Sequence, residues 1–196
     1  MNRREAIKKA AWMSGIALSA PSLVAALQGC STDLTPDWTP AFFTDEEAVL
    51  VAELAETILP RTDTPGAKDA LVHRFLDMWM SEYVPAESSA QMRESLRKFD
   101  ETARSEHGSP FVDLDAATKL ALVKRVNEEA LQNRPGTQPP AGSTFPNFID
   151  FKEAVFVGFF TSQLVGEDVL AYNPIPGDYV GCLPLEEATG GKVWSL

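Results

Sequence analysis

The chain has 196 residues, enough for one domain of ordinary size together with a leader segment. Hydrophobic residues make up 44% of it, which is typical of a globular protein and excludes a disordered chain. The formal net charge is -11, and because residues 1–29 carry +3, the remaining 167 residues carry -14. A body this acidic repels phosphate backbones, so we expect no nucleic-acid partner. Two cysteines and two histidines also exclude a disulfide framework and most metal clusters.

Residues 1–29 have the pattern of an export signal. A basic start that holds Arg3 and Arg4 precedes an apolar run over residues 10–27, which proline and small residues interrupt. Such a run is too weak for a permanent membrane span and fits a cleaved segment. The arginine pair is similar to the twin-arginine export motif. The alternative is the ordinary basic start of a general secretion signal, and both routes predict an exported, periplasmic protein.

The sequence Leu27-Gln28-Gly29-Cys30 is similar to a lipobox, in which the cysteine is acylated and becomes the mature N-terminus. Two acyl chains would anchor the protein firmly to a membrane. The alternative is cleavage that leaves an unmodified cysteine. Residues 30–43 are polar and contain proline, which predicts a short tether. Residues 44–196 are then the domain proper.

The domain is predicted to be all-α, with about five amphipathic helices and no strand run long enough for a sheet. A capping box at Thr44 and Glu47 begins the first helix, residues 45–59, and Pro60 ends it. Apolar residues at helical spacing predict further helices over 68–84, 87–106, 113–133 and 147–164. The apolar stripes expected to face the core in helices two and three are Leu71, Val72, Phe75, Leu76, Trp79, Met80, Tyr83, Met92, Leu96, Phe99 and Ala103. In helix four we expect Leu120, Val123, Val126 and Ala130 or their neighbours to be buried.

The fifth predicted helix is apolar nearly all round, so we expect it to lie at the centre of the core or to be covered on a second side by a partner. Before it, residues 134–146 are rich in Pro, Gly, Thr and Ser and predict a surface loop. After it, the tail from Tyr172 has no helical period. Its Pro and Gly content predicts an extended chain that wraps over the helices.

The segment Ile58-Leu-Pro-Arg-Thr-Asp-Thr-Pro-Gly-Ala67 connects the first two helices. Its short oxygen-bearing side chains from Thr62 to Thr64, and the pair Pro65-Gly66, are typical of a tight turn. The hydroxyls and the glycine would also suit a ligand loop. Because nothing else in the sequence supplies catalytic partners, we favour a rigid corner between the helices that also touches a partner.

Residues suited to chemistry are scarce. His73 and Asp77, spaced i and i+4, could bind a metal from one helix face, but no third ligand accompanies them and a solvent-facing pair is simpler. Nucleophile, phosphate-loop and haem-attachment motifs are absent from the sequence. Cys182 is expected to be a packed small residue. The acidic residues that we expect to face solvent are Glu46, Glu47, Glu53 and Glu56. We predict no catalytic, cofactor or metal site.

Three stretches resemble one known family, gluconate 2-dehydrogenase subunit 3. The first runs from Ile58 to Ala67 and is followed by Phe75-Leu76-Asp77. The second is Phe159-Phe160-Thr161-Ser162, and the third runs from Tyr172 to Cys182. The resemblance covers roughly residues 45–184.

The resemblance implies an accessory subunit without a redox centre of its own. Its partner would be a large FAD-containing dehydrogenase of the glucose–methanol–choline type, which oxidises a sugar, polyol or sugar acid. A multihaem cytochrome c subunit commonly receives the electrons in such systems. The small subunit would carry the export signal and escort the folded flavoprotein. The residues assigned to structural or partner-contacting motifs are Thr62, Asp63, Thr64, Pro65, Gly66, Tyr172, Pro176 and Gly177.

Two alternatives remain at this stage. One is a stand-alone periplasmic lipoprotein that binds a small ligand in its helical domain, which an apolar pocket with a few convergent polar groups would favour. The other is an enzyme that uses His73 together with Asp77 or Asp63. The sugar or polyol cannot be named from this chain, because the substrate pocket would belong to another polypeptide.

Overall fold

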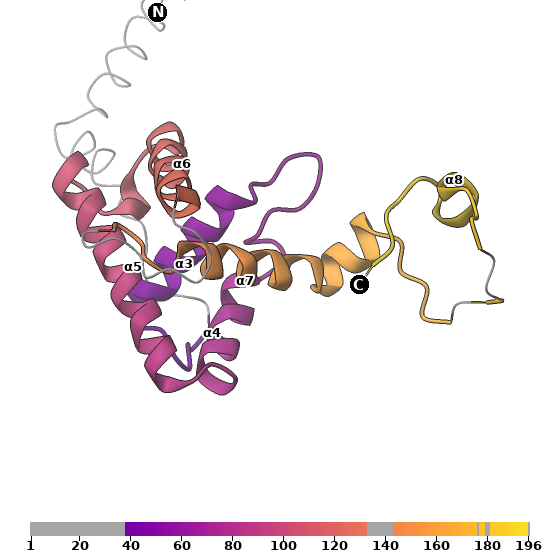
Figure 1. The fold of residues 1–196 in the computed structure, drawn as a ribbon, viewed down its shortest axis with the longest axis horizontal. Helices are drawn as coiled ribbons and strands as arrows, with labels where there is room; N and C mark the ends of the chain where they lie inside the picture. The colour runs from indigo at the N-terminus through magenta and orange to yellow at the C-terminus, as the bar shows by residue number, and fades with distance from the viewer. Residues whose placement is uncertain (1–37, 133–142, 176, 179–180, 196) are drawn as a thin grey trace, which may run out of the picture. The chain divides into compact units, whose positions relative to one another are not determined.

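The computed structural model describes residues 38–132, 143–175, 177–178 and 181–195. These residues form helices, and the isolated bridge between Ala171 and Trp194 is the one β-type pairing among them. The prediction of an all-α domain is therefore confirmed. In chain order the elements are α3 (Asp45–Ile58), α4 (Val72–Glu82), α5 (Ala86–His107), η1 (Phe111–Asp113), α6 (Ala116–Gln132), α7 (Phe148–Phe160), η2 (Val165–Val169) and α8 (Leu185–Thr189), as Figure 1 shows.

Helix α3 is the element against which most of the others pack. It begins at the predicted capping box: the Glu47 N–H donates to Thr44 Oγ1 at 3.2 Å, and the Thr44 N–H donates to Glu47 Oε2 at 2.9 Å. It contacts α4, α6, α7 and η1 (Figure 1). Its residues Val51 and Leu54 have no exposed surface. The sequence pattern thus predicts both the helix and its buried face correctly.

Helix α4 begins later than predicted, at Val72 instead of residue 68. The cause is Leu71, which adopts a left-handed conformation with a φ of 54° and separates the preceding turn from the helix. A leucine rarely adopts this conformation, so no sequence rule anticipates it. The shift leaves Leu71 45% exposed, although we expected it in the core.

Helix α6 also begins later than predicted, at Ala116. The Asp115 carboxylate accepts hydrogen bonds from the Thr118 hydroxyl at 2.6 Å and from the N–H groups of Ala117 and Thr118 at 3.0 and 3.1 Å. These hydrogen bonds hold the pKa of Asp115 below its usual range, and the bond from the Thr118 hydroxyl contributes most. Asp115 therefore starts the helix, and η1 precedes it as a separate turn.

The core is dominated by phenylalanine. The rings of Phe99 and Phe111 lie 4.9 Å apart, and the ring of Phe145 lies 5.6 to 5.9 Å from those of Phe99, Phe148 and Phe151. Each of these side chains is at most 2% exposed, and full burial of one stabilises the fold by about 1.5–3 kcal/mol. Phe145 lies in the segment predicted as a surface loop, and for this residue that prediction is wrong. One aromatic residue anchors an otherwise polar stretch.

Two further residues of the predicted apolar stripes are exposed. Leu120 is 42% exposed, and Leu122 is buried in its place. Tyr83, at the end of α4, is 69% exposed. The face of α6 that packs on α3 includes Lys119, whose stem is covered because its ammonium reaches Glu53 at 3.0 Å. The buried face differs from the predicted one at its start, whereas Val123 and Val126 are buried as predicted.

The tail closes on itself through main-chain hydrogen bonds. The Ala171 N–H donates to the Val193 carbonyl at 2.8 Å, and the Ser195 N–H donates to the Ala171 carbonyl at 2.9 Å. The Lys192 ammonium donates to the Asp168 carbonyl at 2.9 Å. We call residues 171–195, which contain α8, the C-terminal loop (Figure 1). The predicted wrapping over the helices does not agree with its burial, because its large apolar side chains are exposed.

Candidate functional site

The corner between α3 and α4 folds around the carboxylate of Glu56. Glu56 Oε1 accepts the Arg61 N–H at 2.9 Å, and Glu56 Oε2 accepts the Lys68 N–H at 2.8 Å. One carboxylate of α3 therefore fixes both ends of the corner. The prediction that Glu56 is a solvated surface charge is wrong, because its oxygens satisfy backbone groups that a tight turn leaves without helical partners.

Gly66 is buried at the base of this corner, and its N–H donates to Asp69 Oδ2 at 2.9 Å. A Cβ at this position would lie 2.6 Å from Glu56 Oε2 and 2.7 Å from the Arg61 nitrogen, so only glycine fits. The residues at the tip are exposed, and these are Thr62, Asp63 and Thr64; Pro65 is half-buried. The geometry is that of a rigid corner with an accessible tip.

A second acidic residue of α3, Glu53, joins two lysines. Its carboxylate pairs with the Lys119 ammonium at 3.0 Å and with the Lys68 ammonium. Burial alone would raise the pKa of Glu53, but the hydrogen bonds and charges of Lys68 and Lys119 outweigh it and hold the pKa below its usual value. Glu53 thus connects α3 to the corner and to α6, and it is not the solvated charge that we predicted.

Asp77 is buried, with 2% of its surface exposed, and it binds backbone. Its carboxylate accepts the N–H groups of Ala41 at 2.7 Å, Phe42 at 3.0 Å and Phe43 at 2.9 Å. Three successive N–H groups therefore meet one carboxylate, which is a charge-assisted arrangement. The interpretation of His73 and Asp77 as a solvent-facing pair is wrong. Among the described residues, no group of three or more metal-binding side chains is found.

Residues 38–43, which we call the N-terminal strap, are packed on the domain although we assigned them to the tether. The Arg93 guanidinium of α5 lies 4.3 Å from the Phe42 ring centroid, donates to the Phe42 carbonyl and pairs with Glu47 at 3.1 Å. At the start of the strap, the Trp38 ring lies 6.1 Å from the His73 ring. The strap is thus held by α4 through Asp77 and by α5 through Arg93.

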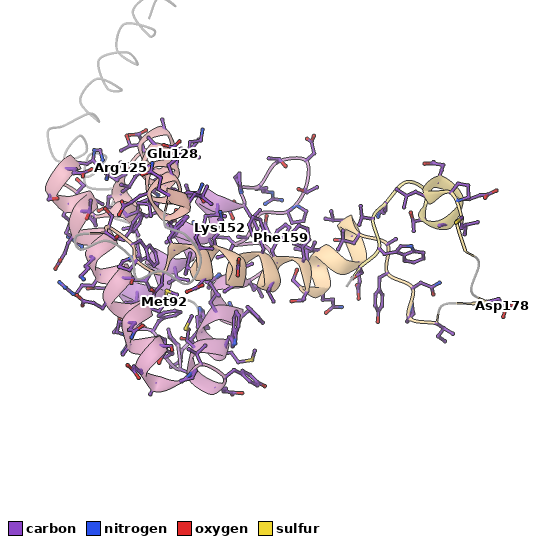
Figure 2. The ribbon with its side chains drawn as sticks, in the orientation of Figure 1. Met92, Arg125, Glu128, Lys152, Phe159 and Asp178 are labelled. Atoms are coloured by element: carbon purple, nitrogen blue, oxygen red, sulfur yellow. The ribbon has the colours of Figure 1, made fainter. Side chains whose placement is uncertain are left out.

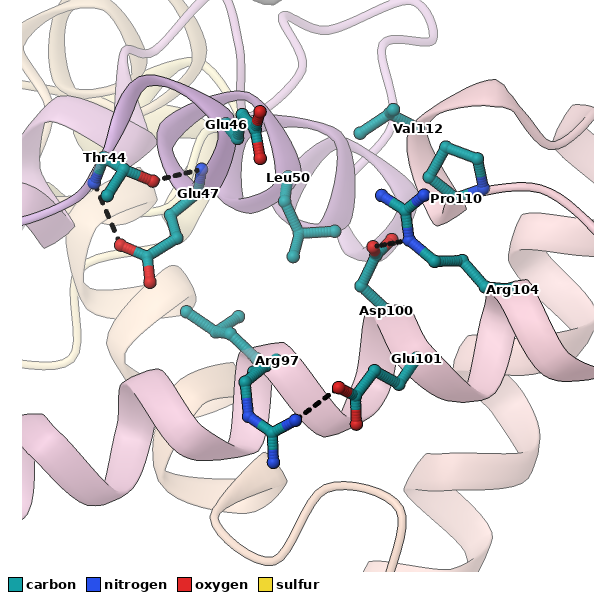
Figure 3. Close-up of a pocket in the computed structure, with 11 residues that line it drawn as sticks. Thr44, Glu46, Glu47, Leu50, Arg97, Asp100, Glu101, Arg104, Pro110 and Val112 are labelled. Carbon is teal, nitrogen blue, oxygen red and sulfur yellow. Dashed lines mark hydrogen bonds and ion pairs between the residues drawn. The ribbon is translucent and has the colours of Figure 1, made fainter.

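A groove of about 450 Å³ lies among α3, α5 and residues 110–112 (Figure 3). Its two arginines pair with acidic residues of the same helix: Arg104 Nε contacts Asp100 Oδ2 at 2.7 Å, and Arg97 pairs with Glu101. Asp100 Oδ1 also accepts the Phe111 N–H at 2.8 Å. These charged groups stabilise α5 and its junction with η1. The groove therefore gives the hypothesis of a stand-alone ligand-binding protein no support.

Exposed apolar side chains occur on several elements of the described chain, and two of these places, α7 and the C-terminal loop, bear on function. On α7, the rings of Phe156 and Phe160 stack with centroids 6.3 Å apart, and Val157 beside them is 46% exposed. We call these three residues the outer face of α7. The C-terminal loop exposes a second set, and Figure 2 shows Asp178 on the same loop. That set is Tyr172, Ile175, Leu183, Leu185, Val193 and Trp194. Contiguous exposed apolar residues mark contact sites for other molecules.

The remaining predicted residues are distributed as follows. Tyr172 is 58% exposed, and Gly177 is exposed with open space around it. Cys182 is an exposed free thiol with a φ of 59°, so the prediction of a packed cysteine is wrong. The predicted residues that lie outside the described part of the chain are Arg3, Arg4, Cys30 and Pro176.

No helix within the described ranges combines the length and the apolar character that crossing a bilayer requires.

The family model described as gluconate 2-dehydrogenase subunit 3 matches residues 45–177, from the first residue of α3 into the C-terminal loop. No curated protein and no solved structure gives a significant match.

Proposed function

Because the chain belongs to the gluconate 2-dehydrogenase subunit 3 family, we propose that it is the non-catalytic accessory subunit of an exported, FAD-dependent dehydrogenase of sugars, polyols or sugar acids. The observation that carries this proposal is the extent of the match, which includes α3, the corner, α4 and α7. A match over this much of the domain indicates similarity of the whole domain and not of a single motif.

In this proposal the chemistry belongs to a large flavoprotein subunit of the glucose–methanol–choline type. That subunit holds FAD and the substrate pocket, and a cytochrome c subunit takes the electrons onward. The present chain stabilises the complex. The exposed apolar residues on α7 and on the C-terminal loop support this role, because a lasting partner would cover them. An obligate interface of this kind buries about 2,000 Å² or more.

The chain also acts as an escort during export. The leader with Arg3 and Arg4 supplies the signal, and the flavoprotein crosses the membrane with it. A twin-arginine route suits this role because it carries folded proteins. The flavoprotein can therefore receive its FAD before translocation. Acylation of Cys30 anchors the complex on the periplasmic side of the membrane.

Co-expression tests the proposal. The full chain is produced together with the large flavoprotein subunit of its own genome, and dehydrogenase activity and flavin are measured in the periplasmic and cytoplasmic fractions. We expect periplasmic activity to fall to background when this chain is omitted or when both Arg3 and Arg4 are changed to Lys, while the flavoprotein stays in the cytoplasm. A chain that remains monomeric beside that flavoprotein, without changing its location, would refute the proposal.

A further inference from the structure

We propose that the C-terminal loop is the docking element of this chain, and that it binds a basic patch on the catalytic flavoprotein subunit. The inference rests on the proposed function and assigns the surface that performs it. It is drawn from the exposure, closure and charge of residues 171–195.

The loop is rich in exposed apolar side chains. Of the thirteen large apolar residues exposed in the described chain, six lie in this loop. Ile175 is 83% exposed, Val193 65% and Trp194 48%. Apolar exposure of this density, outside a core, is typical of a surface that another protein covers.

The base of the loop is already closed before a partner binds. The bridge between Ala171 and Trp194 closes it at its base, and Lys192 ties it to the Asp168 carbonyl. Inside it, α8 ends at Gly190, whose φ of 65° suits glycine. A closed loop loses less conformational freedom on binding than an open tail, so more of the contact energy appears as affinity.

The charge of the C-terminal loop indicates which kind of partner binds it. The loop contains three acidic residues, Asp178, Glu186 and Glu187, and one cation, Lys192, so its net charge is -2. A second copy of the chain would present the same negative charges and be repelled, and so would a bilayer of anionic lipids. A protein surface with basic residues around an apolar centre is complementary. The loop's first residues also lie within the part that the family model matches.

The apolar contribution is tested with a double variant, Ile175→Ser with Val193→Ser. The matched control is Leu120→Ser with Leu131→Ser, which removes two apolar residues exposed at 42% and 64% on α6. Affinity for the purified large subunit is measured with the full chain by biolayer interferometry. We expect the loop variant to bind at least tenfold more weakly and the control to stay within twofold. Circular dichroism checks that helix content is unchanged.

The charge contribution is tested with Glu187→Lys against Glu128→Lys, since Glu128 is an exposed residue of α6 (Figure 2). We expect Glu187→Lys to slow association and to reduce the dependence of the rate on salt, whereas Glu128→Lys leaves both unchanged.

The outcomes separate the two proposals. If the unmodified chain does not bind the large subunit, the proposed function fails. If it binds and the loop variants bind equally well, the docking assignment fails while the function stands. If the loop variants instead abolish self-association or binding to phosphatidylcholine vesicles, the occupant is a second copy or a bilayer, and the assignment to the flavoprotein is overturned.

Discussion

The carboxylate of Asp77 meets three successive backbone N–H groups, and this contact joins two parts of the chain that lie about 35 residues apart in sequence. The segment that it holds has no secondary structure of its own, so its N–H groups need an external acceptor once they are buried. Arg93 then covers the same segment from α5. At the scale of single residues, the domain is thus stabilised by side chains that replace missing backbone partners.

Changing Asp77 to Asn tests this role. The amide keeps the shape but removes the charge and replaces one accepting oxygen with a donor, so at least one buried N–H group loses its partner. We expect the free energy of unfolding in urea at pH 7 to fall by about 1.5–3 kcal/mol. The exposed Asp178→Asn variant should change it by less than about 0.5 kcal/mol. An equal effect of the two variants would show that the carboxylate does not hold the strap.

A pH dependence follows from Glu53. Its pKa is lower in the folded protein than its ordinary value of 4.5, so the charged carboxylate stabilises the fold above about pH 4.5. This stabilisation is lost as the pH falls through the lowered pKa. At pH 7, Glu53→Gln should reduce the free energy of unfolding by about 1–3 kcal/mol, because Lys119 loses a partner while it is mostly buried.

The difference between Glu53→Gln and the unmodified protein should therefore shrink steadily below pH 4.5 in urea unfolding series. Glu128→Gln on the exposed face of α6 serves as the control and should show no such trend. A difference that stays constant from pH 7 to pH 3 would contradict the role of the charged carboxylate.

At the scale of the element, the corner between α3 and α4 depends on a glycine. In Gly66→Ala the new methyl group would meet the Glu56 carboxylate and the Arg61 nitrogen, and the carboxylate would have to release a backbone N–H group. We expect a loss of about 1–3 kcal/mol in the free energy of unfolding. Gly177→Ala is the matched control, because nothing lies within 4 Å of its Cβ position.

The same variant distinguishes a corner from a ligand loop. Complexes that still form with Gly66→Ala should oxidise the same substrates in the same order of preference, because the corner shapes this chain and not the active site. A changed order of preference in steady-state kinetics would mean that the corner reaches the substrate.

The sequence predicts elements well where local signals define them. The capping box at Thr44, the proline at position 60 and the regular stripe of α5 place two helices within about a residue of their observed bounds. The start of α4 is missed because it depends on one left-handed leucine, Leu71. Phe145 is missed because its burial comes from distant rings, which local composition does not encode.

The candidate site is predicted less completely than the fold. Its main contacts join residues that are distant in sequence, which local patterns do not reveal. Gly66 is found because a tight turn has a local signature. The roles of Glu56 and Asp77 are not found, since both carboxylates bind backbone that local patterns leave unassigned. The one local signal for a buried carboxylate is the position of Asp77 directly after Leu76, on the predicted apolar stripe of α4.

At the scale of the whole molecule, the chain combines a closed helical core with apolar surfaces that remain exposed. The phenylalanine cluster shows that the domain has a core of its own, so exposure on α7 and on the C-terminal loop is not the result of an incomplete fold. Apolar spacing predicts the helical domain, and composition predicts its acidic character. It does not predict which apolar residues stay outside, because that depends on how the helices pack.

The N-terminal strap also limits the distance between this domain and a bilayer to which an acylated Cys30 would be attached. The domain contacts its own chain from Trp38 onward, and seven residues, or eight Cα–Cα steps, separate Trp38 from Cys30. Fully extended, they span at most about 28 Å. With lipid on Cys30, the subunit and its flavoprotein would diffuse in two dimensions within that height of the membrane. Adding twenty Gly-Ser residues after Ser31 should leave thermal stability unchanged and slow electron delivery to a membrane-bound acceptor, measured as oxygen uptake by intact cells.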